Sequence, residues 1–222
     1  MSAAVVEPAA PRLKIAEIFF SLQGESDSVG WPTVFVRLTG CPLRCTYCDT
    51  SYAFTGGEWM SVEAVLERVR GLAMKHVCVT GGEPLAQKAC LGLLARLCDE
   101  GYSVSLETSG ALSLEGVDAR VVKVVDVKTP ASGESHRNLL PELDRLDAKD
   151  QVKFVICNRP DYDWSKALVQ ERALAQRFAV LFSPSASELP PQDLADWILA
   201  DRLPVRLQVQ LHKILWGNTP GK

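Results

Sequence analysis

The chain has 222 residues, of which 47% are hydrophobic and 23% charged, with a formal net charge of −3 at pH 7. This length and composition are typical of one globular domain. The slightly acidic balance argues against a broad nucleic-acid-binding surface, and no apolar stretch is long enough to span a bilayer.

The chain begins with a short segment that is expected to lie outside the fold. Residues 1–12 are predicted to form a disordered extension, and residues 13–222 a single domain. The first ten residues are small and apolar, but they lack the basic leading segment of a secretory signal. With seven cysteines, an odd number, this favours a reducing cytoplasm without disulfides.

Strand and helix patterns alternate along the rest of the chain. Strands are predicted at 33–39, 77–80, 104–107, 121–127, 152–157, 179–182 and 205–210, from their apolar and β-branched residues. Helices are predicted after Ser61, which can act as an N-cap, and at 84–100, 139–146, 164–176 and 192–199. This order predicts a parallel sheet with right-handed crossovers. We expect an α/β fold, a modified and incomplete (β/α) barrel with its chemistry at the C-terminal ends of the strands.

Three cysteines follow the first of these strands. Cys41, Cys45 and Cys48 form a C-x3-C-x2-C run. Three thiolates on a 4Fe-4S cluster leave one iron open to a substrate or cofactor. A zinc site is the alternative, but structural zinc usually takes four ligands, commonly in paired C-x2-C units, and there is no second pair. The other four cysteines are expected to be free and mostly buried.

A second motif, T-G-G-E-P, occupies residues 80–84 after the next predicted strand. Together with the three cysteines it resembles the radical S-adenosylmethionine (SAM) superfamily. The resemblance implies that the open iron binds SAM and that one-electron reduction cleaves SAM to methionine and a 5'-deoxyadenosyl radical. It also implies that the Gly82–Glu83 segment contacts the methionine part of the cofactor.

Further segments narrow the resemblance. They are F-S-L-Q-G-E-S at 20–26, Arg37, C-D-T at 48–50, D-V-K-T-P at 126–130 and L-Q-V-Q-L-H-K at 207–213. Over about residues 14–216 the chain resembles the 7-carboxy-7-deazaguanine synthase family. The resemblance implies conversion of 6-carboxy-5,6,7,8-tetrahydropterin to 7-carboxy-7-deazaguanine with loss of ammonia, in queuosine and related deazapurine biosynthesis. It further implies Mg²⁺, a homodimer and an external electron donor of the flavodoxin or ferredoxin type.

The resemblance assigns roles on the substrate side of the site. Glu25 can accept two N–H bonds from the aminopyrimidinone edge of a pterin. The guanidinium of Arg37 suits the substrate carboxylate, with a buried ion pair as the alternative. His212 is expected to bind an anionic group or move a proton. Further substrate contacts are expected from Leu22, Gln23, Gly24 and Thr80.

On the cofactor side, Thr50 is expected to bind Mg²⁺, which prefers oxygen ligands. This assignment rests on the resemblance, because a threonine hydroxyl is an unusual metal ligand. The expected SAM contacts are Asp49, Gly82, Glu83, Asp126, Lys128 and Ser183. Lys128 has a simpler alternative as a solvated lysine at a strand end.

Two other functions stay open at this point. One is an activase that makes a glycyl radical on a partner protein, which would need an open face for a polypeptide. The other is a zinc-binding interaction module without enzymatic activity. Iron and sulfide content separates the second from the radical enzymes.

Overall fold

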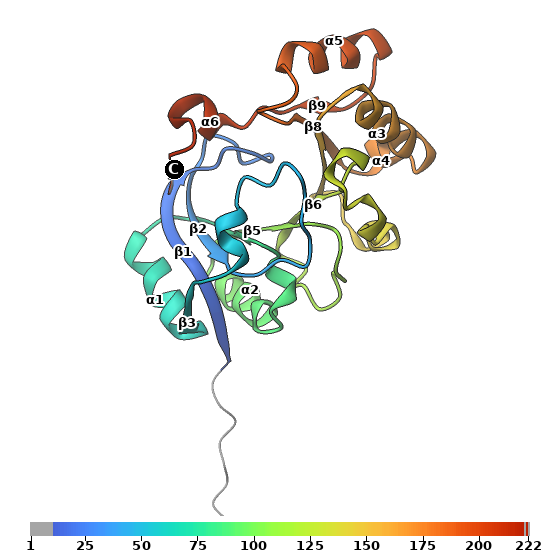
Figure 1. The fold of residues 1–222 in the computed structure, drawn as a ribbon. Helices are drawn as coiled ribbons and strands as arrows, with labels where there is room; N and C mark the ends of the chain where they lie inside the picture. Colours follow the sequence, from blue (N-terminus) through green and yellow to red (C-terminus); the bar gives the residue numbers. More distant parts are fainter. Residues whose placement is uncertain (1–10, 220, 222) are drawn as a thin grey trace, which may run out of the picture.

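The computed structural model describes residues 11–219 and residue 221. Its central feature is a nine-stranded sheet in the order β3-β1-β2-β4-β5-β6-β7-β8-β9 (Figure 1). The strands are β1 Arg12–Leu22, β2 Pro32–Leu38, β3 Glu58–Ser61, β4 His76–Gly81, β5 Ser103–Thr108, β6 Val122–Asp126, β7 Gln151–Ile156, β8 Ala179–Pro184 and β9 Arg206–Leu207. The predicted extension lies mostly outside the described residues, and the sheet already begins at Arg12.

The sheet is parallel from β2 to β9, and β1 runs antiparallel to both β2 and β3. In the described part of the chain, β3 and β9 form the two edges and do not pair with each other. The predicted incomplete (β/α) barrel is therefore confirmed.

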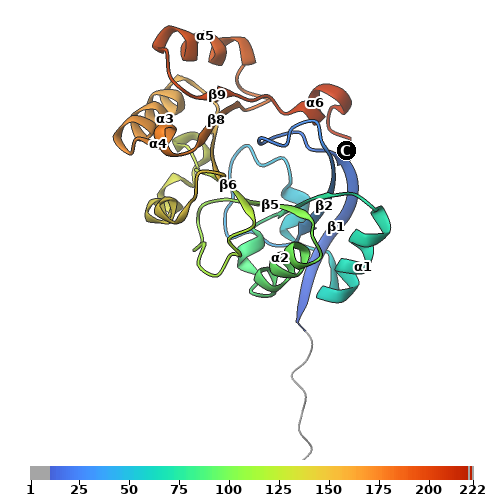
Figure 2. The ribbon, with the colours of Figure 1, turned by 180° about the vertical axis from the view of Figure 1, so that it is seen from behind.

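Most of the α-helices cover the outer face of this curved sheet. The α-helices are α1 Val62–Leu72, α2 Ala89–Asp99, α3 Arg159–Glu171, α4 Leu174–Arg177, α5 Pro191–Asp201 and α6 Leu211–Trp216. Short 3-10 helices are η1 Ser51–Phe54, η2 Pro84–Ala86, η3 Pro130–Ser132, η4 Ser135–Arg137 and η5 Leu140–Arg145. Helices α1 and α2 lie by β1 to β5, while α3, α4 and α5 lie by β7 to β9 (Figures 1 and 2). Within the described residues, no helix is both long and apolar enough to cross a membrane.

The apolar core lies between the sheet and these helices, in two clusters. One joins β1, β2, β4 and β5 to α1 and α2, and the other joins β6, β7 and β8 to α3 and α5. Strand β7 shows the alternation that separates core from cavity: Phe154 and Ile156 are in the core, whereas Lys153 and Val155 line the cavity. Because successive side chains point to opposite faces, the inner face is left for polar groups.

Two predicted helices are divided. In 84–100, the helix is interrupted at Gln87, whose backbone is extended and whose side chain hydrogen-bonds Lys14 and Thr39. The helix predicted at 164–176 begins at Arg159 instead, because Asn158 caps it, and it is broken by Ala173 at φ 49°.

Other boundaries also differ from the sequence prediction. The segment 139–146 forms the 3-10 helix η5, and the last strand is limited to Arg206–Leu207. Strands β1 and β3 were not predicted. In β1 the register shifts between Ile15 and Glu17, and a shift of this kind breaks the apolar alternation that would mark the strand.

Candidate active site

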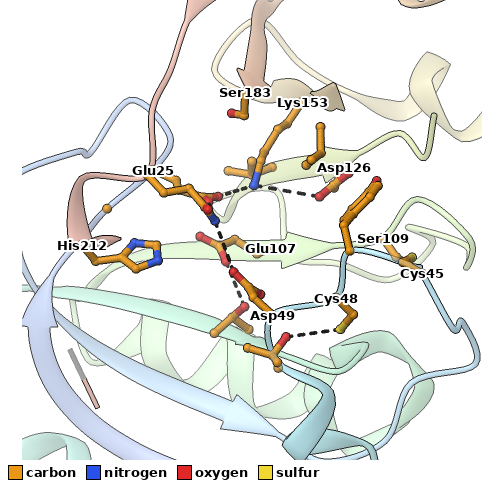
Figure 3. Close-up of a pocket in the computed structure, with 18 of the residues that line it drawn as sticks. Glu25, Cys45, Cys48, Asp49, Glu107, Ser109, Asp126, Lys153, Ser183 and His212 are labelled. Carbon is orange, nitrogen blue, oxygen red and sulfur yellow. Dashed lines mark hydrogen bonds and ion pairs between the residues drawn. The ribbon is translucent and has the colours of Figure 1, made fainter. Parts of the chain in front are cut away.

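A cavity opens at the C-terminal ends of the parallel strands (Figure 3). It is lined by every residue predicted for the site except Glu83, namely Leu22, Gln23, Gly24, Glu25, Arg37, Cys41, Cys45, Cys48, Asp49, Thr50, Thr80, Gly82, Asp126, Lys128, Ser183 and His212. Segments from both ends of the chain thus line the same cavity.

The cysteine loop, residues 41–48, forms one wall of the cavity. Its three cysteines are free and partly exposed. Burial raises the pKa of the Cys45 thiol to about 11, and the positive charge of Lys128 opposes that rise. Among the described residues, no three His, Cys, Asp or Glu side chains are arranged to hold a single metal ion. The irons of a 4Fe-4S cluster lie at separate corners of a cubane, so its cysteine ligands need not converge on a single ion. Three soft thiols that face one cavity fit the donor set of such a cluster.

The Gly81–Gly82 pair packs directly against this loop. A Cβ atom on Gly82 would lie 2.2 Å from the carbonyl oxygen of Gly40, and Gly81 has φ +140°, which disfavours other residues. The amide of Glu83 donates to the same Gly40 carbonyl at 2.7 Å. The two glycines therefore let the end of β4 approach the cysteine loop and expose backbone to the cavity.

The carboxylate of Glu83 points into the protein. It is fully buried and accepts hydrogen bonds from the Leu85 amide, the Thr108 hydroxyl, and both the amide and the hydroxyl of Ser109. Glu83 does not line the cavity. Its side chain instead links the segment after β4 to the end of β5.

Asp126 and Ser183 offer unpaired polar atoms to the cavity. Asp126 Oδ2 lies 3.1 Å from Lys128 Nζ, but Asp126 Oδ1 and Ser183 Oγ are buried with no partner in the described structure. Burial lowers the pKa of Lys128, but Asp126 and the cysteine thiols raise it to about 12. Lys128 is thus a partly buried, charged residue. Buried polar atoms normally have partners, so the two unpaired atoms fit a polar ligand such as a ribose.

Glu25 lies at the other side of the cavity, on the turn between β1 and β2. Its carboxylate forms an ion pair with Lys153 and accepts a hydrogen bond from Gln210 at 2.6 Å. Burial alone would raise the pKa of Glu25, but these partners lower it below its usual value. Glu25 is therefore ionised and acts as an acceptor.

Between these groups lies Glu107 at the end of β5. It accepts from Gln23 Nε2 at 3.2 Å and from Thr80 Oγ1 at 2.9 Å. Both donors, Gln23 and Thr80, were predicted to contact the substrate, and Glu107 forms a hydrogen bond with each of them.

Arg37 lies on β2, beside Thr80 of β4 in the parallel register. Its Nε donates to Glu17 at 2.8 Å, and its guanidinium lies 5.6 Å from the Phe19 ring and 6.0 Å from the Tyr52 ring. Glu17 also accepts from the Tyr52 hydroxyl at 2.7 Å. Arg37 thus forms the partly buried ion pair considered as the alternative, yet it still lines the cavity. The terminal nitrogens of Arg37 have no hydrogen-bond partner within the described residues, which leaves them available to an anion.

His212 is the second residue of α6, which follows the last strand. A Cβ atom on Gly24 would lie 2.1 Å from His212 Nδ1, so only glycine permits this contact. Burial lowers the pKa of His212, although Glu25 and Asp49 act in the opposite direction.

Two further predicted residues directly follow the cysteine loop. Asp49 Oδ2 forms an ion pair with Lys213 Nζ at 2.9 Å. Thr50 Oγ1 lies 3.9 Å from Cys48 Sγ.

Several residues that line this cavity were not predicted as site residues: Phe19, Glu107, Lys153, Gln210 and Lys213. Lys153 carried a usable signal, because it is the one charged residue in the strand Q-V-K-F-V-I. A charge in a buried parallel strand needs a paired partner on the inner face. Glu107 ends the predicted strand 104–107 but was not assigned a role.

Comparisons with known proteins show what the chain is similar to. The model of the radical SAM superfamily matches residues 35–124. The 7-carboxy-7-deazaguanine synthase of Chlorobaculum tepidum is 43% identical over 212 residues, covering 92% of this chain and 94% of the relative. That of Koribacter versatilis is 42% identical over 219 residues, covering 92% and 97%.

Solved structures show the same fold. The crystal structure of QueE from Escherichia coli has a TM-score of 0.76 at 24% identity and covers 90% of this chain and 95% of that chain. Streptococcus suis SuiB bound to S-adenosylmethionine has a TM-score of 0.57 at 13% identity, covering 77% of this chain and 48% of that chain. The first likeness extends over almost the whole fold, and the second over about three quarters of it.

Proposed function

The chain belongs to the 7-carboxy-7-deazaguanine synthase family of the radical SAM superfamily, and on this premise we propose that it converts 6-carboxy-5,6,7,8-tetrahydropterin to 7-carboxy-7-deazaguanine with loss of ammonia. The observation that carries the proposal is a single cavity with a three-cysteine loop on one wall and the oppositely charged Glu25 and Arg37 on others. That arrangement suits a small substrate beside a metal cofactor.

Membership of the radical SAM superfamily implies a 4Fe-4S cluster and SAM. Cys41, Cys45 and Cys48 would hold the cluster. When bound and given one electron by an external reductant, the cluster and SAM would supply radical hydrogen-abstraction chemistry. The exposed backbone at Gly82 and the unpaired oxygens of Asp126 and Ser183 would bind polar parts of SAM, with Asp49 and Lys128 as further polar neighbours.

The substrate would bind by charge complementarity. The ionised carboxylate of Glu25 would accept the N–H donors of the aminopyrimidinone edge, and Arg37 would receive the substrate carboxylate. Thr80 and the backbone of residues 22–24 would contact the ring. Burial lowers the pKa of His212, which favours the neutral imidazole, and a neutral imidazole can accept a proton during the loss of ammonia.

We propose Mg²⁺ as a third bound group, with the Thr50 hydroxyl and the substrate carboxylate among its ligands. Thr50→Ala should retain iron and cofactor cleavage but shift the Mg²⁺ dependence of turnover to higher concentration, because one hard oxygen ligand is lost. Turnover measured in a Mg²⁺ titration tests this, with the exposed Thr55→Ala as the control. An unchanged titration midpoint in Thr50→Ala would remove Thr50 from the metal site.

Three further features are proposed from the family. We infer a homodimer, an electron donor of the flavodoxin or ferredoxin type, and a cytoplasmic location, the last supported by seven cysteines that are all free. Sedimentation velocity and reduction assays with either donor test the first two. A monomer at micromolar concentration would contradict the first. Localisation of a tagged chain by fractionation tests the third.

The function is tested by anaerobic reconstitution followed by product identification. The reconstituted protein should be brown. Once reduced and supplied with SAM and 6-carboxy-5,6,7,8-tetrahydropterin, it should form 7-carboxy-7-deazaguanine, and deuterium at C6 of the substrate should appear in 5'-deoxyadenosine. Cys41→Ala should lose iron and all activity, whereas the peripheral Cys98→Ala should retain both. Unlabelled 5'-deoxyadenosine without this product would favour the activase, and a colourless zinc protein would favour the interaction module.

A further inference from the structure

Lys153 is a positively charged residue that lines the cavity, and the proposed function assigns it no role. Its ammonium group forms an ion pair with Glu25 and lies 3.9 Å from Asp126 Oδ2 (Figure 3). Asp126 is paired in turn with Lys128 at 3.1 Å. A line of alternating charges therefore runs from the substrate side of the cavity to the cysteine loop.

The surroundings of Glu25 make this lysine necessary. The charged or titratable groups that face the Glu25–Lys153 pair are Asp126 on β6, Glu107 on β5, Asp49 after the cysteine loop, and His212 and Lys213 on α6. Burial and the nearby Asp49 carboxylate favour the protonated form of Glu25, and Lys153 is the main group that opposes them. A buried carboxylate without a cationic partner would take up a proton.

The pair also leaves room for a ligand. An ionised carboxylate offers about four lone-pair positions. Lys153 and Gln210 each occupy one of those on Glu25, so about two remain. Two free acceptor positions match the paired N–H donors of a neutral aminopyrimidinone edge, whereas the positive charge of Lys153 disfavours a cationic ligand at the same place.

We propose that Lys153 is a positioning residue for substrate recognition: it holds Glu25 ionised and aimed at the neutral donor edge of the substrate. This inference rests on the proposed function, because it takes the pterin as the ligand of Glu25. It gives the positive charge on β7 a role in selecting the substrate.

The test is pterin binding without turnover, measured by equilibrium dialysis from pH 6 to pH 9 in the absence of SAM. In Lys153→Met, the pKa of Glu25 should rise, so binding should be weakest at low pH and recover as pH rises through the new pKa. We expect affinity at pH 6 to fall about 10- to 100-fold relative to the wild-type chain, and Lys153→Arg to restore a profile close to wild type.

Two controls make the result specific. Lys123→Met removes another buried lysine, which pairs with Asp150 at 2.8 Å outside the cavity, and it should leave the profile unchanged. Adding Glu25→Gln to Lys153→Met should abolish the new pH dependence, because no carboxylate remains to titrate.

The outcomes separate this inference from the function. Wild-type affinity in Lys153→Met at every pH, or an equal loss in Lys123→Met, would overturn the role of Lys153 while leaving the function intact. A persistent pH dependence in the double variant would also overturn it. If the wild-type chain failed to bind the pterin at all, the proposed function would fall, and this inference with it.

Discussion

At the scale of single residues, two buried glutamates have different roles, because their hydrogen-bond partners and orientations differ. Glu25 and Glu83 are both buried and both lie in motifs that predicted ligand contacts. Glu25 has a lysine partner and faces the cavity, whereas Glu83 is surrounded by four neutral N–H and O–H donors inside the wall. The motif position alone did not distinguish them, because orientation depends on which strand end lies opposite.

Glu83→Gln tests the supporting role. The amide would present an N–H group to donors on Ser109 and Thr108, and one or more of these buried groups would lose its acceptor. We expect a loss of about 1–3 kcal/mol in the free energy of unfolding, measured by urea denaturation of the cluster-free protein. The exposed Glu115→Gln should change stability by less than about 0.5 kcal/mol. Equal stability of the Glu83→Gln variant and the wild-type chain would contradict this role.

At the scale of elements, long-range side-chain hydrogen bonds hold the site-bearing turn in place. The substrate turn, residues 23–31 between β1 and β2, includes Ser26 at φ 64°. Gln208, just after β9, accepts from the Ser26 amide at 2.7 Å and donates to the Ser26 carbonyl at 2.8 Å. Gln151 accepts from the Asp27 amide at 2.9 Å. Because a non-glycine residue at positive φ is disfavoured, these contacts stabilise the conformation that presents Glu25.

Gln208→Ala should therefore loosen the substrate turn. We expect the KM for the pterin to rise about tenfold, which corresponds to about 1.4 kcal/mol, while iron content and SAM affinity stay unchanged. Steady-state kinetics and amide hydrogen exchange of residues 23–31 measure the two effects. Gln170→Ala, on the exposed side of α3, serves as the control. A change in kcat alone, with protected amides, would show that Gln208 does not position this turn.

At the scale of the whole molecule, the curved sheet separates an apolar outer layer from a polar inner face. The two core clusters pack the outer face against the helices, so the fold does not depend on filling the barrel with apolar side chains. The inner face can then carry buried charges that are stabilised by pairing with one another. Because the sheet is open, residues 23–31 and residues 208–213 meet beside the cavity and complete its wall.

The sequence by itself determined the features that depend on neighbouring residues. The spacing of Cys41, Cys45 and Cys48 predicted the cysteine loop, and the alternation of apolar strands and helices predicted the partial barrel. Nearly every residue that the short motifs predicted for the site lines the cavity. These signals are local, because loop spacing and side-chain periodicity are set within a few residues of the chain.

Only the tertiary structure decided which of these residues act on one another. Glu25 and Lys153 are 128 positions apart, and no spacing rule connects them. Their contact depends on β7 lying opposite the turn after β1 across the curved sheet. The same holds for the inward direction of Glu83, the Glu17 partner of Arg37 and the packing of His212 against Gly24. A buried charge is stable only with its partner in place, so the chemistry of this site is fixed by contacts that exist only after folding.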